Sequence, residues 1–156
     1  MDTFTHLIIT APSPDLAAVY RNQLEVIRHE LPCLEGCKLF CVADPSGVRI
    51  GSGGGTLNAL HFLDIIIGRS LLSKAKVAII HSGGDSKRAP FHTVCGKAWA
   101  SINAVQGDRL LATPLTMLID ELTMFCRNIL SPSCSSGSII VASSDVMLDI
   151  CLSGGL

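Results

Sequence analysis

The chain has 156 residues, of which 48% are apolar and 16% charged, and its formal net charge is −1. This length suits one domain, and the apolar content excludes an intrinsically disordered chain. Near-neutral charge and a single Trp and Tyr supply neither a basic patch nor a stacking platform, so we expect no nucleic-acid partner. No apolar run reaches the roughly 20 residues of a spanning helix, so we expect no membrane partner.

The cysteines and the N-terminus indicate the cellular setting. There are seven cysteines, an odd number, and Cys41, Cys126 and Cys151 lie inside apolar runs. The first ten residues have neither a basic segment nor a small-residue cleavage site. We therefore expect reduced thiols and a cytoplasmic location. The mean hydropathy of +0.47 predicts an unusually apolar surface, which could contact a protein partner or belong to a larger domain.

Four short apolar runs predict strands. Each is a continuous run rather than an alternating one, which is typical of strands buried on both faces. The runs are His6–Thr10, Lys38–Ala43, Val77–His81 and Ser138–Ser143.

Three segments between these runs have helical spacing. The first begins after Ser13, with a first-turn proline, and is closed by Pro32. The second opens at Thr56, after a glycine-rich loop over Asp44–Gly55, and ends at Gly68; the third is capped by Thr113. The expected inward residues are Leu16, Val19, Tyr20, Leu24, Ile27 and Leu31; Leu57, Leu60, Leu63 and Ile67; and Leu115, Leu118, Leu122, Phe125 and Ile129.

Alternating strands and helices predict one α/β domain over residues 1–156, with a Rossmann-like parallel sheet and right-handed crossovers. In such sheets the ligand lies outside the carboxyl ends of the strands. Each predicted strand is followed there by an unusual polar or glycine-rich segment. These segments are Thr10–Pro12, Ala43–Thr56, His81–Lys97 and Ser143–Asp145.

The first glycine-rich segment is Gly51–Thr56, with sequence GSGGGT. Consecutive glycines before a helix can turn backbone N–H groups towards an anion, and the helix dipole favours negative charge there. The segment is not a dinucleotide fingerprint, which would need glycine in place of Thr56. A phosphate site and a flexible turn fit it equally well.

The second segment combines Gly83, Gly84, Ser86 and Arg88 with Lys97. The glycines allow phosphate to approach the backbone, the serine can donate a hydrogen bond, and the arginine fork matches phosphate oxygens. The spacing is not that of a P-loop. A solvated basic loop is the alternative, and we favour phosphate binding because the segment directly follows a buried strand.

Asp145 follows the last strand and fits either a Mg²⁺ ligand or a helix N-cap. Asp44 fits a turn better than a ribose ligand. We interpret His81 and His92 as loop or core histidines rather than catalytic bases. The cysteine spacing matches no structural zinc signature, and no nucleophilic catalytic set is present. Phosphate-binding glycines, two cations and a metal-type carboxylate favour transfer at phosphorus. The candidate classes are a kinase, a nucleotidyltransferase and a nucleotide-sugar-dependent glycosyltransferase.

Two segments, Asp44–Leu60 and Ile79–Lys97, resemble the fucose pyrophosphorylase family, and Ser143–Leu148 is similar to its strand-end segment with an acidic residue. The family includes fucose-1-phosphate guanylyltransferase and the N-terminal region of L-fucokinase. The resemblance implies a nucleotidyltransferase fold of the sugar pyrophosphorylase type. It implies the reaction of GTP with β-L-fucose 1-phosphate to give GDP-fucose and pyrophosphate.

The resemblance also implies roles for individual residues. Arg88 and Lys97 would be catalytic and would stabilise the charge of the triphosphate and of the forming pyrophosphate. Asp145 would hold Mg²⁺, although Ser144 stands where sugar pyrophosphorylases commonly have glycine. The residues expected to bind the nucleotide are Gly53, Gly54, Gly55, Thr56, Gly83, Gly84 and Ser86.

Family members are much longer than this chain. We therefore expect residues 1–156 to be the N-terminal, nucleotide-binding part of an incomplete nucleotidyltransferase domain. One alternative is an N-terminal fragment of an L-fucokinase, with ATP as nucleotide and its kinase domain absent. Another is a non-catalytic product that associates with a protein partner through its apolar surface.

Overall fold

The computed structural model describes residues 4–82, 96–102, 112–129, 136–146 and 148. Four strands form one parallel sheet in the order β2-β1-β3-β4. The α/β class and all four predicted strands are confirmed, with β1 and β3 one residue longer than expected. Their bounds are β1 His6–Ala11, β2 Lys38–Ala43, β3 Lys76–His81 and β4 Ser138–Ser143.

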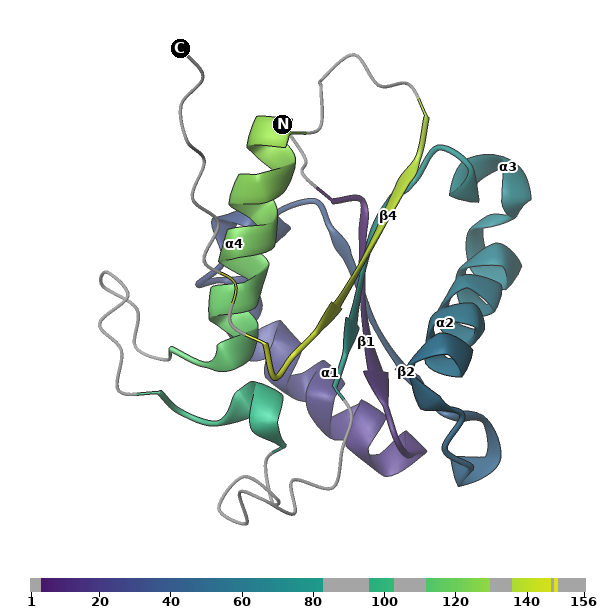
Figure 1. Ribbon diagram of the computed structural model, residues 1–156, viewed down its shortest axis with the longest axis horizontal. Helices are drawn as coiled ribbons and strands as arrows, with labels where there is room; N and C mark the ends of the chain where they lie inside the picture. Colours follow the sequence, from purple (N-terminus) through teal and green to yellow (C-terminus); the bar gives the residue numbers. More distant parts are fainter. Residues whose placement is uncertain (1–3, 83–95, 103–111, 130–135, 147, 149–156) are drawn as a thin grey trace.

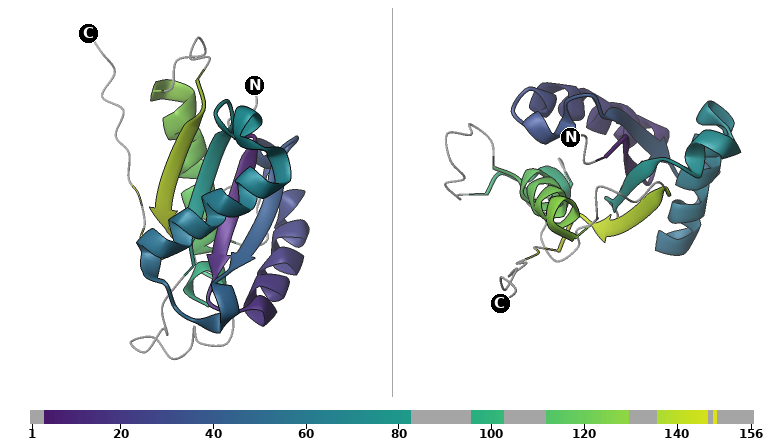
Figure 2. Two further views of the ribbon diagram at one scale, coloured as in Figure 1. Left: turned by 90° about the vertical axis from the view of Figure 1, so that its right-hand side faces the viewer. Right: turned by 90° about the horizontal axis from the view of Figure 1, so that it is seen from above.

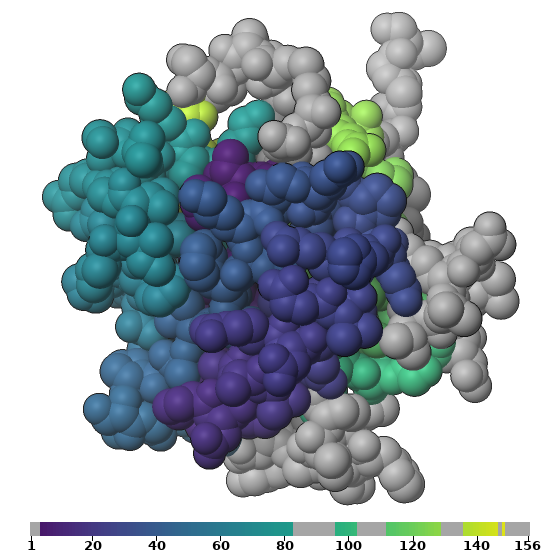
Figure 3. Space-filling model, turned by 180° about the vertical axis from the view of Figure 1, so that it is seen from behind, coloured from purple at the N-terminus to yellow at the C-terminus, as the bar shows by residue number. Residues whose placement is uncertain are grey.

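Helices cover both faces of the sheet (Figures 1 and 2). One face carries α1 (Pro14–Arg28) and α4 (Pro114–Ile129), and the other carries α2 (Gly51–Ile67) with the short α3 (Arg69–Leu72). Seen from behind, α1 and the segment leading into β2 occupy the middle of the surface (Figure 3). The short 3-10 helices are η1 Pro32–Leu34, η2 Pro45–Gly47 and η4 Lys97–Trp99.

Two helix caps form as the sequence predicts. The Ser13 hydroxyl accepts a hydrogen bond from the Leu16 N–H at 3.3 Å, and the Thr113 hydroxyl accepts one from the Thr116 N–H at 3.2 Å. Each cap satisfies an N–H group that has no partner inside its own helix. The expected face of α1 is wrong at one position, because Val19 is 46% exposed.

The core consists of two layers, one on each side of the sheet. Alternate strand residues point to opposite faces. Ile8 and Ile79 pack with Leu63 of α2 in one layer, whereas Ile9 and Ile80 belong to the layer that includes α1 and α4. The inner strands β1 and β3 are therefore buried on both faces, as their continuous apolar runs predict. The same expectation is wrong for β4, where Ile139 and Val141 are each 48% exposed.

The glycine-rich stretch Gly51–Gly55 is helical, which corrects the predicted loop. α2 begins at Gly51 rather than Thr56, and Leu57, expected to face inward, is 70% exposed. The buried face is instead narrow and includes Gly55 and Leu63. Glycine has low intrinsic helix propensity, but packing can override propensity. Here the absence of a side chain at Gly55 lets the helix approach β3, where an added Cβ would lie 3.2 Å from His81 Cε1.

The crossovers between strands do not all have the same hand. The β1–β2 and β3–β4 steps run in opposite directions along the sheet, yet α1 and α4 pack on the same face. The β1–β2 and β3–β4 crossovers therefore have opposite hands. The β2–β3 crossover differs from the β1–β2 crossover both in its direction along the sheet and in the face that its helix covers. These two differences cancel, so the β1–β2 and β2–β3 crossovers have the same hand. The expectation that every crossover is right-handed is thus wrong. The crossover that differs from the other two is the β3–β4 connection, which spans residues 82–137 and includes both η4 and α4. The preference for right-handed crossovers describes simple strand–helix–strand units.

Large apolar side chains are exposed on α2, α3 and β4, as the mean hydropathy predicts. No disulfide involves Cys41 or Cys126, which are buried thiols, and burial raises the pKa of Cys41 to about 11. Within the described ranges, no helix is long and apolar enough to cross a membrane. A protein partner for the exposed face stays a prediction. The exposed large apolar residues of these three elements are Leu57, Ile65, Ile66, Leu71, Ile139 and Val141.

The helical start of α2 is testable by alanine substitution. Gly53 lies in the helix, with open space where its Cβ would be, so Gly53→Ala should raise the free energy of unfolding by about 0.5–1 kcal/mol. Gly51 has a φ of +71°, so Gly51→Ala should lower that free energy by about 1–2 kcal/mol. Urea unfolding followed by circular dichroism measures both. No change, or a loss, in Gly53→Ala would mean that residues 51–55 are not helical.

Candidate functional site

The register of the sheet aligns three polar residues in one row. Thr10 of β1 pairs with His81 of β3, and His81 pairs with Ser143 of β4. Residues paired in register point to the same face, and two residues earlier Ile8 and Ile79 pack against α2. The side chains of Thr10, His81 and Ser143 therefore point to the α2 face at the carboxyl ends of their strands.

A cavity of about 360 Å³ lies at this edge of the sheet. Its walls come from the ends of all four strands and from the first turns of α2. This is the position expected for a ligand in an open parallel sheet. The lining residues are Thr10, Ala11, Pro12, Asp44, Arg49, Gly51, Ser52, Gly55, His81, Ser82 and Ser143.

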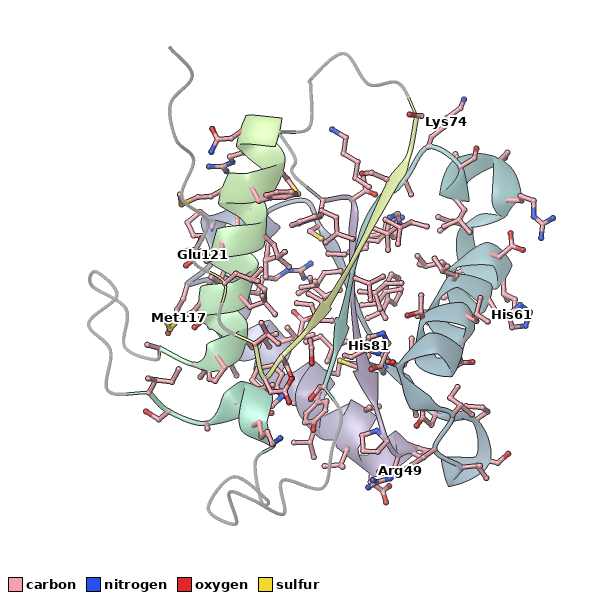
Figure 4. The ribbon with its side chains drawn as sticks, viewed as in Figure 1. Arg49, His61, Lys74, His81, Met117 and Glu121 are labelled. Carbon is pink, nitrogen blue, oxygen red and sulfur yellow. The ribbon has the colours of Figure 1, made fainter. Side chains whose placement is uncertain are left out.

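His81 connects the sheet to α2 (Figure 4). Its Nδ1 lies 3.0 Å from the Thr10 hydroxyl, and its Nε2 lies 2.8 Å from the Thr56 hydroxyl. The Thr56 hydroxyl also donates to the Ser52 carbonyl oxygen at 3.0 Å. Side chains from β1, β3 and α2 thus meet in one hydrogen-bonded series beside the cavity.

These contacts are compatible with only one neutral form of the imidazole. A carbonyl oxygen can only accept, so the single Thr56 hydroxyl proton goes to Ser52, and His81 Nε2–H must donate to Thr56. In the neutral ring, Nδ1 then accepts from the Thr10 hydroxyl. Burial lowers the pKa of His81, and the negative charge of Asp44 partly opposes this shift. His81 is therefore a neutral, fully hydrogen-bonded group rather than a free base.

Two charged residues line the mouth of the cavity. Asp44 follows β2, and its N–H donates to the Ala11 carbonyl oxygen at 2.8 Å. Arg49 lies just before α2, beyond the strand ends (Figure 4). The Asn58 amide donates to the Ala43 carbonyl oxygen at 3.0 Å and ties α2 to the end of β2. The lining thus includes a guanidinium, a group that binds anions, and a carboxylate, which can accept hydrogen bonds from hydroxyl groups.

Lys97 and Asp145, residues distant in sequence, form an ion pair. Lys97 Nζ lies 3.5 Å from Asp145 Oδ2, and both side chains are partly exposed. Gly96, with a φ of +76°, lies against the Tyr20 hydroxyl, and Trp99 contacts the Tyr20 ring. These contacts attach the short segment of Lys97 to α1. The Ser143 hydroxyl donates to Asp145, and this bond and the Lys97 charge lower the pKa of Asp145.

The sequence-predicted site residues have different places in the structure. Gly55 lines the cavity and Thr56 bonds to His81, whereas Gly53 and Gly54 are not among its lining residues. Lys97 and Asp145 contact each other. Four predicted residues lie outside the described ranges: Gly83, Gly84, Ser86 and Arg88.

Sequence reasoning missed several residues of the cavity. Arg49 and Ser52 line its mouth, and His81 bonds to two threonines. A usable signal was present, because polar His81 and Ser143 each end an apolar strand and Thr10 is the next-to-last residue of β1. The partners of His81 depend on the sheet register, which sequence spacing alone does not reveal.

Asp145 is the only predicted metal ligand. In the described part of the chain, no three His, Cys, Asp or Glu side chains are grouped as a protein metal site. A single ionised carboxylate nevertheless fits Mg²⁺, which commonly takes one or two protein carboxylates together with substrate phosphates and water. The lowered pKa of Asp145 keeps that carboxylate ionised.

A parallel sheet with a polar cavity at its carboxyl edge defines an α/β protein of the ligand-binding type. The model of the fucose pyrophosphorylase domain matches residues 69–154, more than half of the chain. The chain belongs to the fucose pyrophosphorylase family. The matched range includes β3, β4, Lys97 and Asp145, and it excludes Gly53–Thr56.

Curated proteins with similar sequences have related names. The chain is 26% identical over 164 aligned residues to the bifunctional fucokinase/GDP-fucose pyrophosphorylase of Arabidopsis thaliana, covering 93% of this chain and 16% of that protein. It is 35% identical over 117 residues to the fucose-1-phosphate guanylyltransferase of Homo sapiens, covering 72% and 18%. It is 29% identical over 125 residues to the L-fucokinase/L-fucose-1-P guanylyltransferase of Bacteroides fragilis, covering 77% and 13%. The chain thus spans less than a fifth of these relatives, and no solved structure matches it significantly.

The partly buried, neutral His81 makes stability depend on pH. Its pKa is lowered in the folded protein, so the unfolded chain binds the extra proton first, and stability should fall as pH falls through about 6.5. His81→Gln removes this group. The difference in unfolding free energy between wild type and His81→Gln should therefore shrink between about pH 7.5 and pH 5. Urea titrations across that range measure it, and a difference that stays constant would contradict the lowered pKa.

Proposed function

We propose that this chain is the nucleotide-binding part of a fucose-1-phosphate guanylyltransferase. The reaction joins GTP and fucose 1-phosphate: a sugar-phosphate oxygen bonds to the α-phosphorus of GTP, and the bond to pyrophosphate breaks. The observation that supports this most directly is the convergence of the four strand ends and α2 on one cavity in a chain of the fucose pyrophosphorylase family. The names of the relatives supply the substrates.

Phosphoryl transfer needs positioning and charge stabilisation rather than a protein nucleophile. In the proposal, Arg88 and Lys97 stabilise the phosphate charge, and Arg49 adds a further cation at the mouth of the cavity. Gly53, Gly54, Gly55 and Thr56 contact the nucleotide together with Gly83, Gly84 and Ser86. Asp145 holds Mg²⁺, which would supply charge neutralisation at the phosphate oxygens. The protein would act in the cytoplasm, where nucleotide triphosphates and reduced thiols are available.

The ion pair between Lys97 and Asp145 must break before each residue can bind its proposed partner. The ion pair is partly exposed, so breaking it costs little free energy. A phosphate group can therefore replace Asp145 as the partner of the Lys97 ammonium. The Asp145 carboxylate is then available to bind a cation. The two residues would then separate their roles when the nucleotide binds.

A second candidate is a part of an L-fucokinase that binds ATP. The observation in its favour is that two relatives have names that combine fucokinase and GDP-fucose activities. Base preference separates the candidates, because a guanylyltransferase part should prefer Mg-GTP and a kinase part should prefer Mg-ATP. Phosphorylation of fucose by this chain alone is not expected under either reading.

Charge removal tests the proposed phosphate site. Lys97→Ala should weaken Mg-GTP binding by about tenfold, the order expected for one charge-assisted hydrogen bond. Arg88→Ala should weaken it at least as much. Lys74→Ala is the matched control, because Lys74 is exposed near the opposite edge of the sheet (Figure 4), and it should leave binding unchanged. Isothermal titration calorimetry with Mg-GTP and Mg-ATP measures all three variants.

Three results would contradict the proposed function. One is a folded wild-type chain, verified by circular dichroism, that binds neither nucleotide. Another is equal weakening by Lys74→Ala and Lys97→Ala, which would indicate non-specific attraction of an anion. Preference for Mg-ATP would favour the fucokinase candidate instead.

A further inference from the structure

His81 has a place in the fold that the proposed roles do not use. It is the last residue of the inner strand β3, it lines the cavity, and each of its ring nitrogens contacts a threonine hydroxyl. Both ring nitrogens are engaged by Thr10 and Thr56. No free lone pair therefore remains for proton transfer to or from a substrate. Whatever His81 contributes must come through the groups that it holds.

The group with the most direct connection to the cavity is Thr56. Its hydroxyl accepts from His81 Nε2 at 2.8 Å and donates to the Ser52 carbonyl oxygen at 3.0 Å, one turn earlier in α2. Ser52 and the adjacent Gly51 line the cavity. A continuous series of hydrogen bonds thus runs from β3 through His81 and Thr56 to the wall formed by the first turn of α2.

The first turn of α2 needs such support. It contains four glycines within Gly51–Gly55, which favour the unfolded chain by their backbone freedom, and its N-cap residue Ile50 offers no side-chain hydrogen bond. Gly55 packs against the His81 ring, with the place of a Cβ only 3.2 Å from Cε1. The imidazole therefore contacts this turn both by a hydrogen bond and by close packing.

We propose that His81 is a positioning residue that holds the first turn of α2, through Thr56, in the conformation in which Gly51 and Ser52 form the nucleotide-facing wall of the cavity. The Nε2–H donor to Thr56 is the bond that matters, and the Thr10 bond fixes which nitrogen has the proton. This inference rests on the proposed nucleotide site for its ligand. Its structural half, the restraint of α2 by His81, does not depend on that ligand.

Two amide variants separate the two bonds of His81. The glutamine amide nitrogen is at the same number of bonds from Cα as His Nε2, so His81→Gln can still donate to Thr56. The asparagine amide is at the level of Nδ1, so His81→Asn keeps only the Thr10 side. A second pair acts on the partner: Thr56→Ser retains the hydroxyl, and Thr56→Val removes it at nearly constant volume. A merely structural role, in which the volume of the side chain matters, would not rank the variants in this order.

The closing experiment combines one ligand-free and one ligand-dependent measurement on the full chain. NMR of wild type should show His81 neutral, with the proton on Nε2. Amide exchange at Gly54–Thr56, the first amides that can bond within α2, should be slow in wild type, His81→Gln and Thr56→Ser, and faster in His81→Asn and Thr56→Val. Mg-GTP affinity should follow the same order, with a loss of about tenfold in the last two variants, as expected for the loss of one partly buried hydrogen bond. Circular dichroism and urea unfolding verify that each variant is folded.

The outcomes distinguish this inference from the proposed function. A proton on Nδ1, or equal exchange in His81→Gln and His81→Asn, would overturn the positioning role even if wild type binds Mg-GTP. The expected exchange order in a chain that binds no nucleotide would support the restraint of α2 and overturn only the proposed function. The expected exchange order with unchanged Mg-GTP affinity in all four variants would overturn the claim that this turn faces the nucleotide.

Discussion

The common register of the parallel strands is the constraint on which the rest of the structure depends. Thr10, His81 and Ser143 are far apart in sequence, yet the pairing of β1 with β3 and of β3 with β4 aligns them in one row. Because side chains alternate along a strand, a slip of one residue would turn any of them to the α1 face. The apolar residues buried on both sides of β1 and β3 oppose such a slip. The core therefore sets the position of the polar residues at the cavity.

The cavity also depends on how closely α2 approaches the sheet. The face of this helix that contacts the sheet includes Gly55, Ala59 and Leu63. Its residues are smallest at the end beside the cavity. Small residues there leave room for the His81 ring between sheet and helix. A larger residue at position 55 would push apart the two surfaces that form the cavity wall. Gly55 thus has a packing role in addition to any contact with phosphate.

The strands were predictable from the sequence because a strand buried on both faces has a continuous apolar run, as in Ile79–Ile80 of β3. The helix caps at Ser13 and Thr113 were predictable for a similar reason, since local hydrogen bonding determines them. The start of α2 was not, because glycine propensity favours a loop, whereas the helix depends on tertiary packing that includes the contact of Gly55 with His81. Neither the pairing of His81 with two threonines nor that of Lys97 with Asp145 could be predicted, because both depend on which strand ends become neighbours.

The part of the chain that matches the fucose pyrophosphorylase family contributes residues to the cavity. The family match includes the two strands that bear His81 and Ser143, and the cavity lies at their carboxyl ends. Ile139 and Val141 of β4 lie on the same face of the sheet as α2. They are exposed because α2 does not cover that part of the face. The chain spans only a small part of its relatives, and the proposal for its described residues is therefore limited to nucleotide binding.

The most direct test of the central claim is an NMR titration of the isotope-labelled chain with Mg-GTP. The account predicts shift changes concentrated at the carboxyl edge of the sheet: Thr10–Ala11, Gly51–Thr56, His81–Ser82 and Ser143–Asp145. Residues at the opposite edge, such as Lys74 and Ser138, should remain unchanged. Shifts spread evenly over the surface, or confined to the apolar side of α2, would contradict a nucleotide site at the strand ends.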